Sequence, residues 1–121
     1  MSVVKVLRSF KYAFNGIALV FVSQTNAKIH TFVAIVVSIL GFYFQVSKQE
    51  WLLLTICIAM VWSAEAFNTA IEHLVDLVSP EYHPLAGKAK DTAAAGVLIL
   101  AIGAFVVGVS IFLPQFLQIV P

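Results

Sequence analysis

The chain contains three long apolar stretches, at residues 29–47, 51–78 and 93–119. A helix needs about 20 residues to cross a hydrocarbon layer about 30 Å thick, and each stretch is close to that length or longer. Strict alternation of apolar and polar residues, which marks the strands of a membrane barrel, is absent from all three. Because only helices and closed barrels satisfy their backbone groups in lipid, the pattern predicts three transmembrane helices.

The first 25 residues follow a different pattern. Apolar residues recur there at spacings of three and four, and they share one helix face: Val3, Leu7, Phe10, Phe14, Ile17 and Phe21. Lys5, Arg8 and Lys11 interrupt the other faces. This pattern predicts an amphipathic helix over residues 1–25 that lies along the membrane surface. A signal peptide is the alternative, but the apolar run from Gly16 to Val22 is short and lacks a small-residue cleavage site.

Polar segments connect these elements. A link from Ser23 to Lys28 leads into the first span, and Val46–Glu50 predicts a tight turn after it. A longer polar loop is expected over Ser79–Asp91, where Pro80 and Pro84 block helix continuation. The expected fold is therefore all-α and integral to the membrane: one domain over residues 1–121, with a surface helix and three transmembrane helices.

Composition agrees with a membrane protein. Hydrophobic residues make up 61% of the chain and charged residues only 11%, which excludes an ordinary soluble domain and also a disordered chain. The formal net charge of +1 offers no basic surplus for nucleic acid, so we expect no nucleic-acid partner. The single cysteine, Cys57, cannot form an internal disulfide and is expected to be a small core residue.

The basic residues predict the orientation. Six of the seven fall on one side of the three predicted spans, namely Lys5, Arg8, Lys11, Lys28, Lys88 and Lys90, and only Lys48 falls on the other. Cytoplasmic segments of membrane proteins carry the excess of Lys and Arg. The N-terminus and the second loop are therefore predicted to be cytoplasmic.

The second span carries the most informative polar residues. Glu65, Asn68, Glu72 and Asp76 are separated by three, four and four residues, so they form one stripe along a helix. An ionisable residue inside the bilayer costs about 2.5–3.5 kcal/mol even on the lenient scale, and a cation or shared protons would offset that cost. The stripe predicts a functional site. The alternative is a helix end whose carboxylates lie in water, and it suits Asp76 best.

The polar loop adds basic and acidic side chains that could bind an anionic group beside the stripe: Lys88, Lys90 and His83, with the carboxylates Glu81 and Asp91. A solvated loop explains the same residues equally well. Small residues along the third span allow close helix packing, and three helices enclose little space, so a buried polar site suggests self-association. Composition and spacing alone predict a small three-span protein with a carboxylate-rich site that binds a cation.

One long motif supports a more specific interpretation than composition and spacing do. It reads Glu65-Ala-Phe-Asn68-Thr69-Ala-Ile71-Glu72 with Val75-Asp76, then Glu81-Tyr82-His83 and Gly87-Lys88-Ala89-Lys90-Asp91. This motif, with the surface helix, the three spans and the length, resembles the prokaryotic diacylglycerol kinase and undecaprenol kinase family. The resemblance implies a homotrimeric inner-membrane enzyme that moves the γ-phosphate of Mg-ATP to a lipid hydroxyl, at sites between protomers on the cytoplasmic side. Diacylglycerol is the first expected acceptor and undecaprenol the alternative.

The resemblance also implies roles for single residues. Glu65 would be the general base, Asn68 would orient the reacting groups, and Glu72 would hold Mg²⁺. The nucleotide would be contacted by Lys90 and Asp91 at its phosphates, by Glu81, Tyr82 and His83 around it, and by Tyr12 and Lys5 from the surface helix. Gln24 departs from the pattern, because many relatives carry a metal-sharing glutamate there; a Gln carbonyl can ligate Mg²⁺ but brings no charge.

A protein of another class is the rival hypothesis. A small oligomer that conducts ions or protons would also carry intramembrane carboxylates, but it would be expected to distribute them through the depth of the membrane. Here all of them lie in the predicted cytoplasmic half of one helix. This placement favours the kinase.

Overall fold

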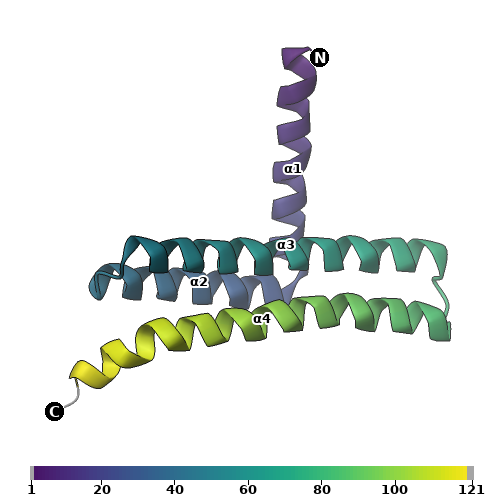
Figure 1. The fold of residues 1–121 in the computed structure, drawn as a ribbon. Coiled ribbons are helices and arrows are strands. Elements are labelled where there is room, and N and C mark those ends of the chain that lie inside the picture. The colour runs from purple at the N-terminus through teal and green to yellow at the C-terminus, as the bar shows by residue number, and fades with distance from the viewer. Residues whose placement is uncertain (1, 120–121) are drawn as a thin grey trace.

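The computed structural model describes residues 2–119 and contains four helices: α1 (Val3–Ser23), α2 (Thr25–Tyr43), α3 (Lys48–Val78) and α4 (Pro84–Ile119). Helices α2, α3 and α4 lie side by side with alternating direction, and α1 runs crosswise to them (Figure 1). The all-helical expectation is confirmed. The three bundled helices are each long and apolar enough to cross a membrane.

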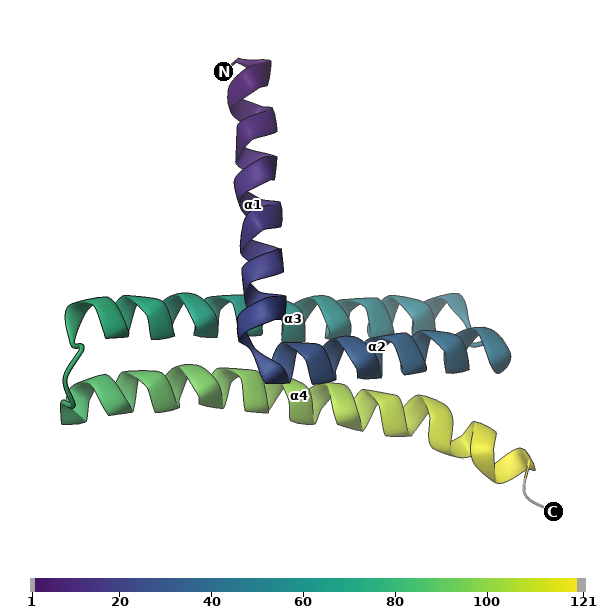
Figure 2. The same ribbon diagram turned by 180° about the vertical axis from the view of Figure 1, so that it is seen from behind.

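The three bundled helices differ in length, and the shortest of them indicates how much of the other two can lie within the hydrocarbon. Helix α2 has 19 residues, so it rises about 28 Å, close to the thickness of the hydrocarbon layer. Helices α3 and α4, with 31 and 36 residues, continue past the start of α2 (Figure 2). Counted from Lys48, a rise of about 30 Å along α3 ends near Asn68. The part of α3 beyond Asn68 therefore projects out of the hydrocarbon.

Helix α1 leaves the bundle near this same level (Figures 1 and 2). Its crosswise direction places it along the membrane surface when the other helices span the bilayer. The apolar residues of its predicted face, among them Leu7, Phe10 and Phe14, are exposed in the protomer. An amphipathic helix with an uncovered apolar face fits the headgroup boundary, as the sequence predicts.

The break between α1 and α2 is shorter than predicted. We expected a polar link from Ser23 to Lys28, but α2 begins at Thr25 and only Gln24 is extended, with φ −112° and ψ 115°. The Gln24 side chain does not cap α2. It is directed instead to α3, where it takes part in the polar site described below.

The turn between α2 and α3 is also tighter than predicted. Gln45 adopts a left-handed conformation with φ 52°, and the Val46 backbone N–H donates to the Gly41 carbonyl, which closes α2. Ser47 and Glu50 then form a reciprocal capping box. The polar residues from Lys48 to Glu50, predicted as part of the turn, are therefore the first turn of α3.

The largest difference concerns the second loop. We predicted a loop over Ser79–Asp91, but α4 begins at Pro84 and the connection is only Ser79–His83. Proline is favoured at the first position of a helix, because its φ is already helical and the N–H it lacks would have no partner there. His83 supports this start, since its ring Nδ1 accepts a hydrogen bond from the Leu85 backbone N–H at 3.1 Å. Pro84 thus starts a helix and does not block one.

Candidate active site

Part of the predicted polar stripe on α3 faces the interior of the bundle. The Glu65 and Asn68 residues are buried, with 1% and 7% of their surface exposed, and Glu72 is half-buried. Asp76, one turn further on, has a side chain that is 62% exposed. The alternative interpretation, a carboxylate in water at a helix end, therefore holds for Asp76 but not for Glu65.

Two amide side chains hold the Glu72 carboxylate. The Gln24 Nε2 donates to Oε2 of Glu72 at 2.7 Å, and Asn68 Nδ2 donates to Oε1 at 3.3 Å. The first bond joins the corner between α1 and α2 to the middle of the polar stripe, 48 residues away in sequence. Gln24 therefore lies beside Glu72, although it presents its donor nitrogen to the carboxylate.

Glu65 lies beside a histidine that we did not predict as a site residue. The Nε2 of His30, on α2, is 3.3 Å from Oε1 of Glu65. Over residues 2–119, this Oε1 and the Oδ1 of Asn68 are buried without a hydrogen-bond partner. Buried polar atoms are normally paired, so these two acceptors mark a place where the polar network of the protomer is incomplete.

A polar cavity of about 260 Å³ surrounds these atoms. Its walls are Asn26 and His30 from α2, Glu65 and Asn68 from α3, and the apolar residues Ala94, Val97, Leu98 and Ala101 from α4. The cavity lies at the level where α3 leaves the hydrocarbon. A small hydroxyl-bearing headgroup could reach the Glu65 carboxylate here.

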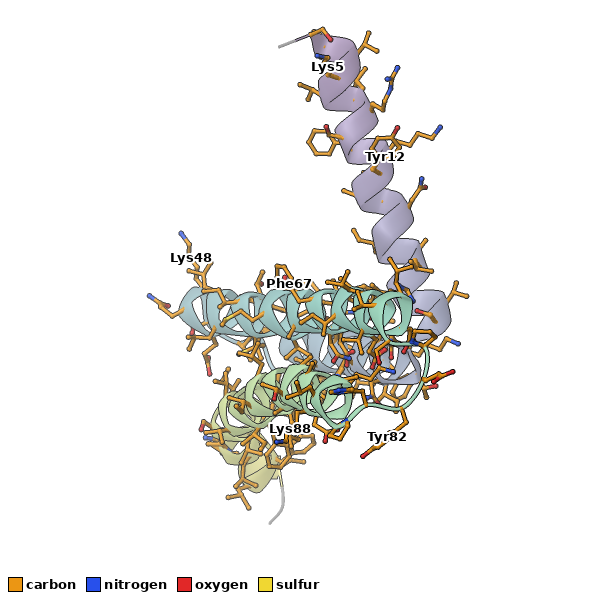
Figure 3. All side chains as sticks on the ribbon, turned by 90° about the vertical axis from the view of Figure 1, so that its right-hand side faces the viewer. Lys5, Tyr12, Lys48, Phe67, Tyr82 and Lys88 are labelled. Carbon is orange, nitrogen blue, oxygen red and sulfur yellow. The ribbon has the colours of Figure 1, made fainter. Side chains whose placement is uncertain are left out.

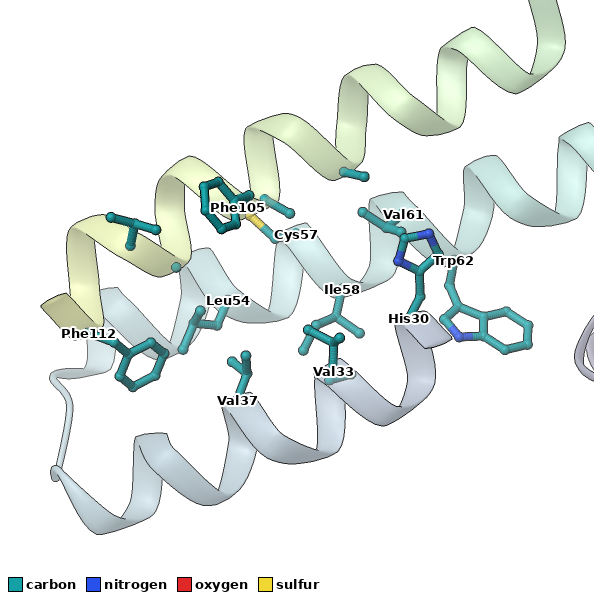
Figure 4. Close-up of a pocket in the computed structure, with 15 residues that line it drawn as sticks. His30, Val33, Val37, Leu54, Cys57, Ile58, Val61, Trp62, Phe105 and Phe112 are labelled. Atoms are coloured by element: carbon teal, nitrogen blue, oxygen red, sulfur yellow. The ribbon is translucent and has the colours of Figure 1, made fainter. Parts of the chain in front are cut away.

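An apolar cavity of about 360 Å³ adjoins the polar one, and His30 and Ala101 line both. It runs between α2, α3 and α4 among side chains such as Val37, Leu54 and Phe112 (Figure 4). Cys57 is a free thiol in its wall. The two cavities together offer a polar end at Glu65 and an apolar groove within the membrane.

The remaining predicted residues of the second loop lie near one another at the far end of α3. Lys90 forms an ion pair with Asp76, and a hollow of about 190 Å³ is lined by Asp76, Glu81, Tyr82, His83 and Lys90 among others. Tyr82 is 90% exposed, and Asp91 is also exposed. Eleven residues separate Asp76 from Glu65, which is about 16 Å along α3. Lys90, held at Asp76, therefore does not reach Glu65 of its own protomer.

Tyr12 and Lys5 are further away still. Both are exposed on α1 and stand clear of the bundle (Figure 3). Along the helix they lie about 18 Å and about 28 Å from Gln24, the residue that contacts Glu72. The protomer does not bring them to the polar stripe.

Glu72 is the residue at which a divalent cation is expected from the sequence, and both of its carboxylate oxygens accept from amide groups in this structure. The part of the chain that the structure describes has no group of three His, Cys, Asp or Glu residues arranged to hold a metal. Mg²⁺ in kinase sites is bound by one or two carboxylates together with substrate phosphates and water. One carboxylate, with the unpaired Oδ1 of Asn68 beside it, suits a metal that arrives with a nucleotide.

Comparison with known proteins gives one consistent result. Residues 11–112 match the family described as prokaryotic diacylglycerol kinase. The chain is 40% identical to the undecaprenol kinase of Bacillus subtilis over 108 residues, which are 89% of this chain and 88% of that protein. It is 41% identical to the diacylglycerol kinase of Synechocystis over 116 residues, 93% of this chain but 65% of that protein. It is 26% identical to the diacylglycerol kinase of Escherichia coli over 102 residues, 84% of each chain.

The pairing of Gln24 with Glu72 predicts the effect of adding a carboxylate. Gln24→Glu should lower the Mg²⁺ concentration for half-maximal activity at fixed ATP by about tenfold, since this needs only about 1.4 kcal/mol and a unit charge at 4 Å contributes about 4 kcal/mol near a protein surface. Gln49→Glu, at the exposed opposite end of α3, adds the same charge as a control. An unchanged midpoint in the Gln24 variant would leave this residue a purely structural link.

Proposed function

Because the chain belongs to the prokaryotic diacylglycerol kinase family and is a lipid kinase of the membrane, we propose that it transfers the γ-phosphate of ATP to the hydroxyl of diacylglycerol, which yields phosphatidic acid. One observation supports transfer to the hydroxyl of a membrane lipid. A buried carboxylate, Glu65, lies where a polar cavity meets an apolar groove, at the level where α3 leaves the hydrocarbon. Family membership also decides against the non-enzymatic ion-conducting oligomer.

Glu65 acts as the general base in this proposal. The lipid chains lie in the apolar groove, and the hydroxyl enters the polar cavity beside the carboxylate. Glu65 accepts the hydroxyl proton as the lipid oxygen bonds to the γ-phosphorus, and the bond from that phosphorus to the bridging oxygen of ADP breaks. Phosphoryl transfer depends mainly on positioning and charge neutralisation, so a rigid, buried base suits it. Asn68, one turn along the same face, orients the reacting groups.

Glu72 is the proposed ligand for Mg²⁺, with Gln24 and Asn68 around it. When bound, the metal would neutralise charge on the ATP phosphates. The Gln24 side chain donates to Glu72, which fixes the carboxylate in place. Gln24 would have to turn its carbonyl oxygen toward the cation to serve as a ligand.

The nucleotide is proposed to lie against the projecting ends of α3 and α4, outside the hydrocarbon. Lys90 and Asp91 would contact its phosphates, and Glu81, Tyr82 and His83 would surround the rest. The ion pair to Asp76 holds the Lys90 ammonium at this end of the bundle. The polar hollow there supports the same placement.

The site is proposed to be divided between the protomers of a homotrimer. Tyr12 and Lys5 lie too far along α1 to reach Glu72 of their own chain, and Lys90 lies too far from Glu65. A neighbouring protomer would bring the missing contacts together. The uncovered small residues of α4, such as Gly96 and Gly103, allow close packing of a second copy.

We further propose that the protein lies in the bacterial inner membrane with its N-terminus and its site on the cytoplasmic side. Lys5, Arg8 and Lys11 lie on α1, Lys28 lies in the first turn of α2, and Lys88 and Lys90 lie near the start of α4, so all six precede the spanning part of α2 or of α4. This excess of basic residues supports that orientation. It also places the site where ATP is available.

Undecaprenol is a second candidate acceptor, favoured by one observation. The undecaprenol kinase of Bacillus subtilis matches over 88% of its length, while the diacylglycerol kinase of similar identity matches over 65% of its own. Undecaprenol carries its hydroxyl at the end of one polyprenyl chain, and diacylglycerol carries its hydroxyl on a glycerol that bears two acyl chains. The same Glu65 chemistry serves either one.

A phosphorylation assay with labelled ATP tests the acceptor. The purified protein, in mixed micelles, would be given diacylglycerol, undecaprenol or a long-chain alcohol of neither class. We expect diacylglycerol to give the highest kcat/KM. A higher value for undecaprenol would reassign the substrate and leave the site unchanged. No labelled product with any of the three lipids would contradict the proposed activity.

The role of Glu65 predicts a large and specific loss. Glu65→Gln keeps the size and the hydrogen-bonding capacity but removes the base, so kcat should fall at least about 100-fold, the lower limit for general-base catalysis. ATP binding should be retained. Glu50→Gln is the matched control, because glutamine also completes a capping box at that position. Near-normal turnover of the Glu65 variant would refute its assignment as the base.

The divided site predicts complementation between two inactive variants. Co-expression of Glu65→Gln with Lys90→Ala should give mixed trimers in which about one quarter of the sites combine an intact Glu65 with an intact Lys90 from a neighbour. We expect about that fraction of the parent activity. Each variant expressed alone is the control. Activity no greater than the sum of the two variants would contradict a site in which these residues come from different protomers.

A further inference from the structure

The buried carboxylate of Glu65 lacks an aligned donor. Its Oε1 accepts no hydrogen bond within residues 2–119, although the side chain is almost fully buried. Leaving a buried acceptor unpaired costs about 1–3 kcal/mol, and more when it is charged. The Nε2 of His30 lies 3.3 Å away, within reach of a hydrogen bond but outside good alignment.

The His30 ring approaches Glu65 through its Nε2. The neighbouring indole of Trp62 donates to Thr31 Oγ1 at 2.9 Å, so Trp62 already has a partner of its own. The ring extends from α2 toward the space beside Val61 and Trp62 (Figure 4). It lines both the polar cavity and the apolar groove, so it stands where a lipid headgroup would pass from one to the other.

We propose that His30 is a positioning residue for Glu65: its Nε2–H donates to Oε1 and turns the other carboxylate oxygen toward the lipid hydroxyl. The inference rests on the proposed role of Glu65 as the base. Catalytic hydrogen bonds are often long or poorly aligned in a free enzyme and tighten when the substrate binds. His30 does not exchange a proton with the lipid in this arrangement. It fixes which oxygen of Glu65 receives that proton.

Three substitutions at His30 separate this role from simple packing. The amide nitrogen of glutamine can occupy the place of Nε2, whereas that of asparagine reaches only the place of Nδ1, and leucine offers no donor. We expect His30→Leu and His30→Asn to lower kcat by about 10- to 100-fold, the scale of loss from misplacing a reacting group by about 1 Å. His30→Gln should keep kcat within about threefold of the parent. The KM for ATP should stay unchanged in all three.

A matched control is available on α3. His73 is exposed and follows Glu72 in sequence without joining the stripe. His73→Leu removes a histidine of the same kind and should leave kcat unchanged. Size-exclusion profiles in detergent would show whether each variant remains assembled. If His30→Leu fails to fold, the comparison of kcat between His30→Gln and His30→Asn still tests the positioning role.

A double-substitution cycle gives a second readout. If His30 acts only through Glu65, the combination of Glu65→Gln with His30→Leu should be no slower than Glu65→Gln alone. Losses that multiply, or equal loss in the glutamine and leucine variants, would overturn the positioning role. Normal turnover of His30→Leu would also overturn it. The proposed function would fail separately, through an active Glu65→Gln protein.

Discussion

Hydrocarbon offers a protein no hydrogen-bond partners, and this constraint organises the whole chain. The spanning segments are helices, which pair their backbone groups internally except at the helix ends and at Pro114, and the carboxylate and amide groups of the site lie together at one level of the bundle. At that level they satisfy each other as far as possible, through Gln24, Asn68 and Glu72. Two acceptors, on Glu65 and Asn68, have no partner within residues 2–119, so the network of the single protomer is incomplete at this level.

The hydrogen bond from Gln24 to Glu72 has two consequences for the structure. It fixes the corner at which the surface helix turns into the membrane, and it fixes the carboxylate proposed to hold the metal. A relative with glutamate at this corner would place two like charges in contact, which need a cation between them. Glutamine makes the same contact as a neutral donor. The hydrogen bond from Gln24 to Glu72 therefore holds this corner without bringing two like charges together.

The sequence predicted the helical class, the three spans and the inward stripe, because these depend on periodicity within one helix. The spacing of Glu65, Asn68 and Glu72 is enough to place them on one face. It could not predict Pro84 as the start of α4, since a proline that stops one helix and a proline that starts the next look alike without the cap that His83 supplies. It did not select His30 either, because the pairing of His30 with Glu65 depends on the register between α2 and α3. The only available signal was a lone histidine one turn inside an otherwise apolar span.

The short length of α2 has a consequence for the lipid environment. Helix α2 rises about 28 Å between the surface helix and the far turn. A bilayer whose hydrocarbon thickness differs from this length must become thinner or thicker around the protein, or the bundle must tilt. Tilt or thinning would shift the height of Glu65 relative to the lipid headgroups while leaving every contact within the bundle intact. The depth of the carboxylate is thus coupled to the chain length of the surrounding lipids. Hydrophobic mismatch would then give the membrane a physical means of setting how readily a lipid hydroxyl meets Glu65, the proposed base.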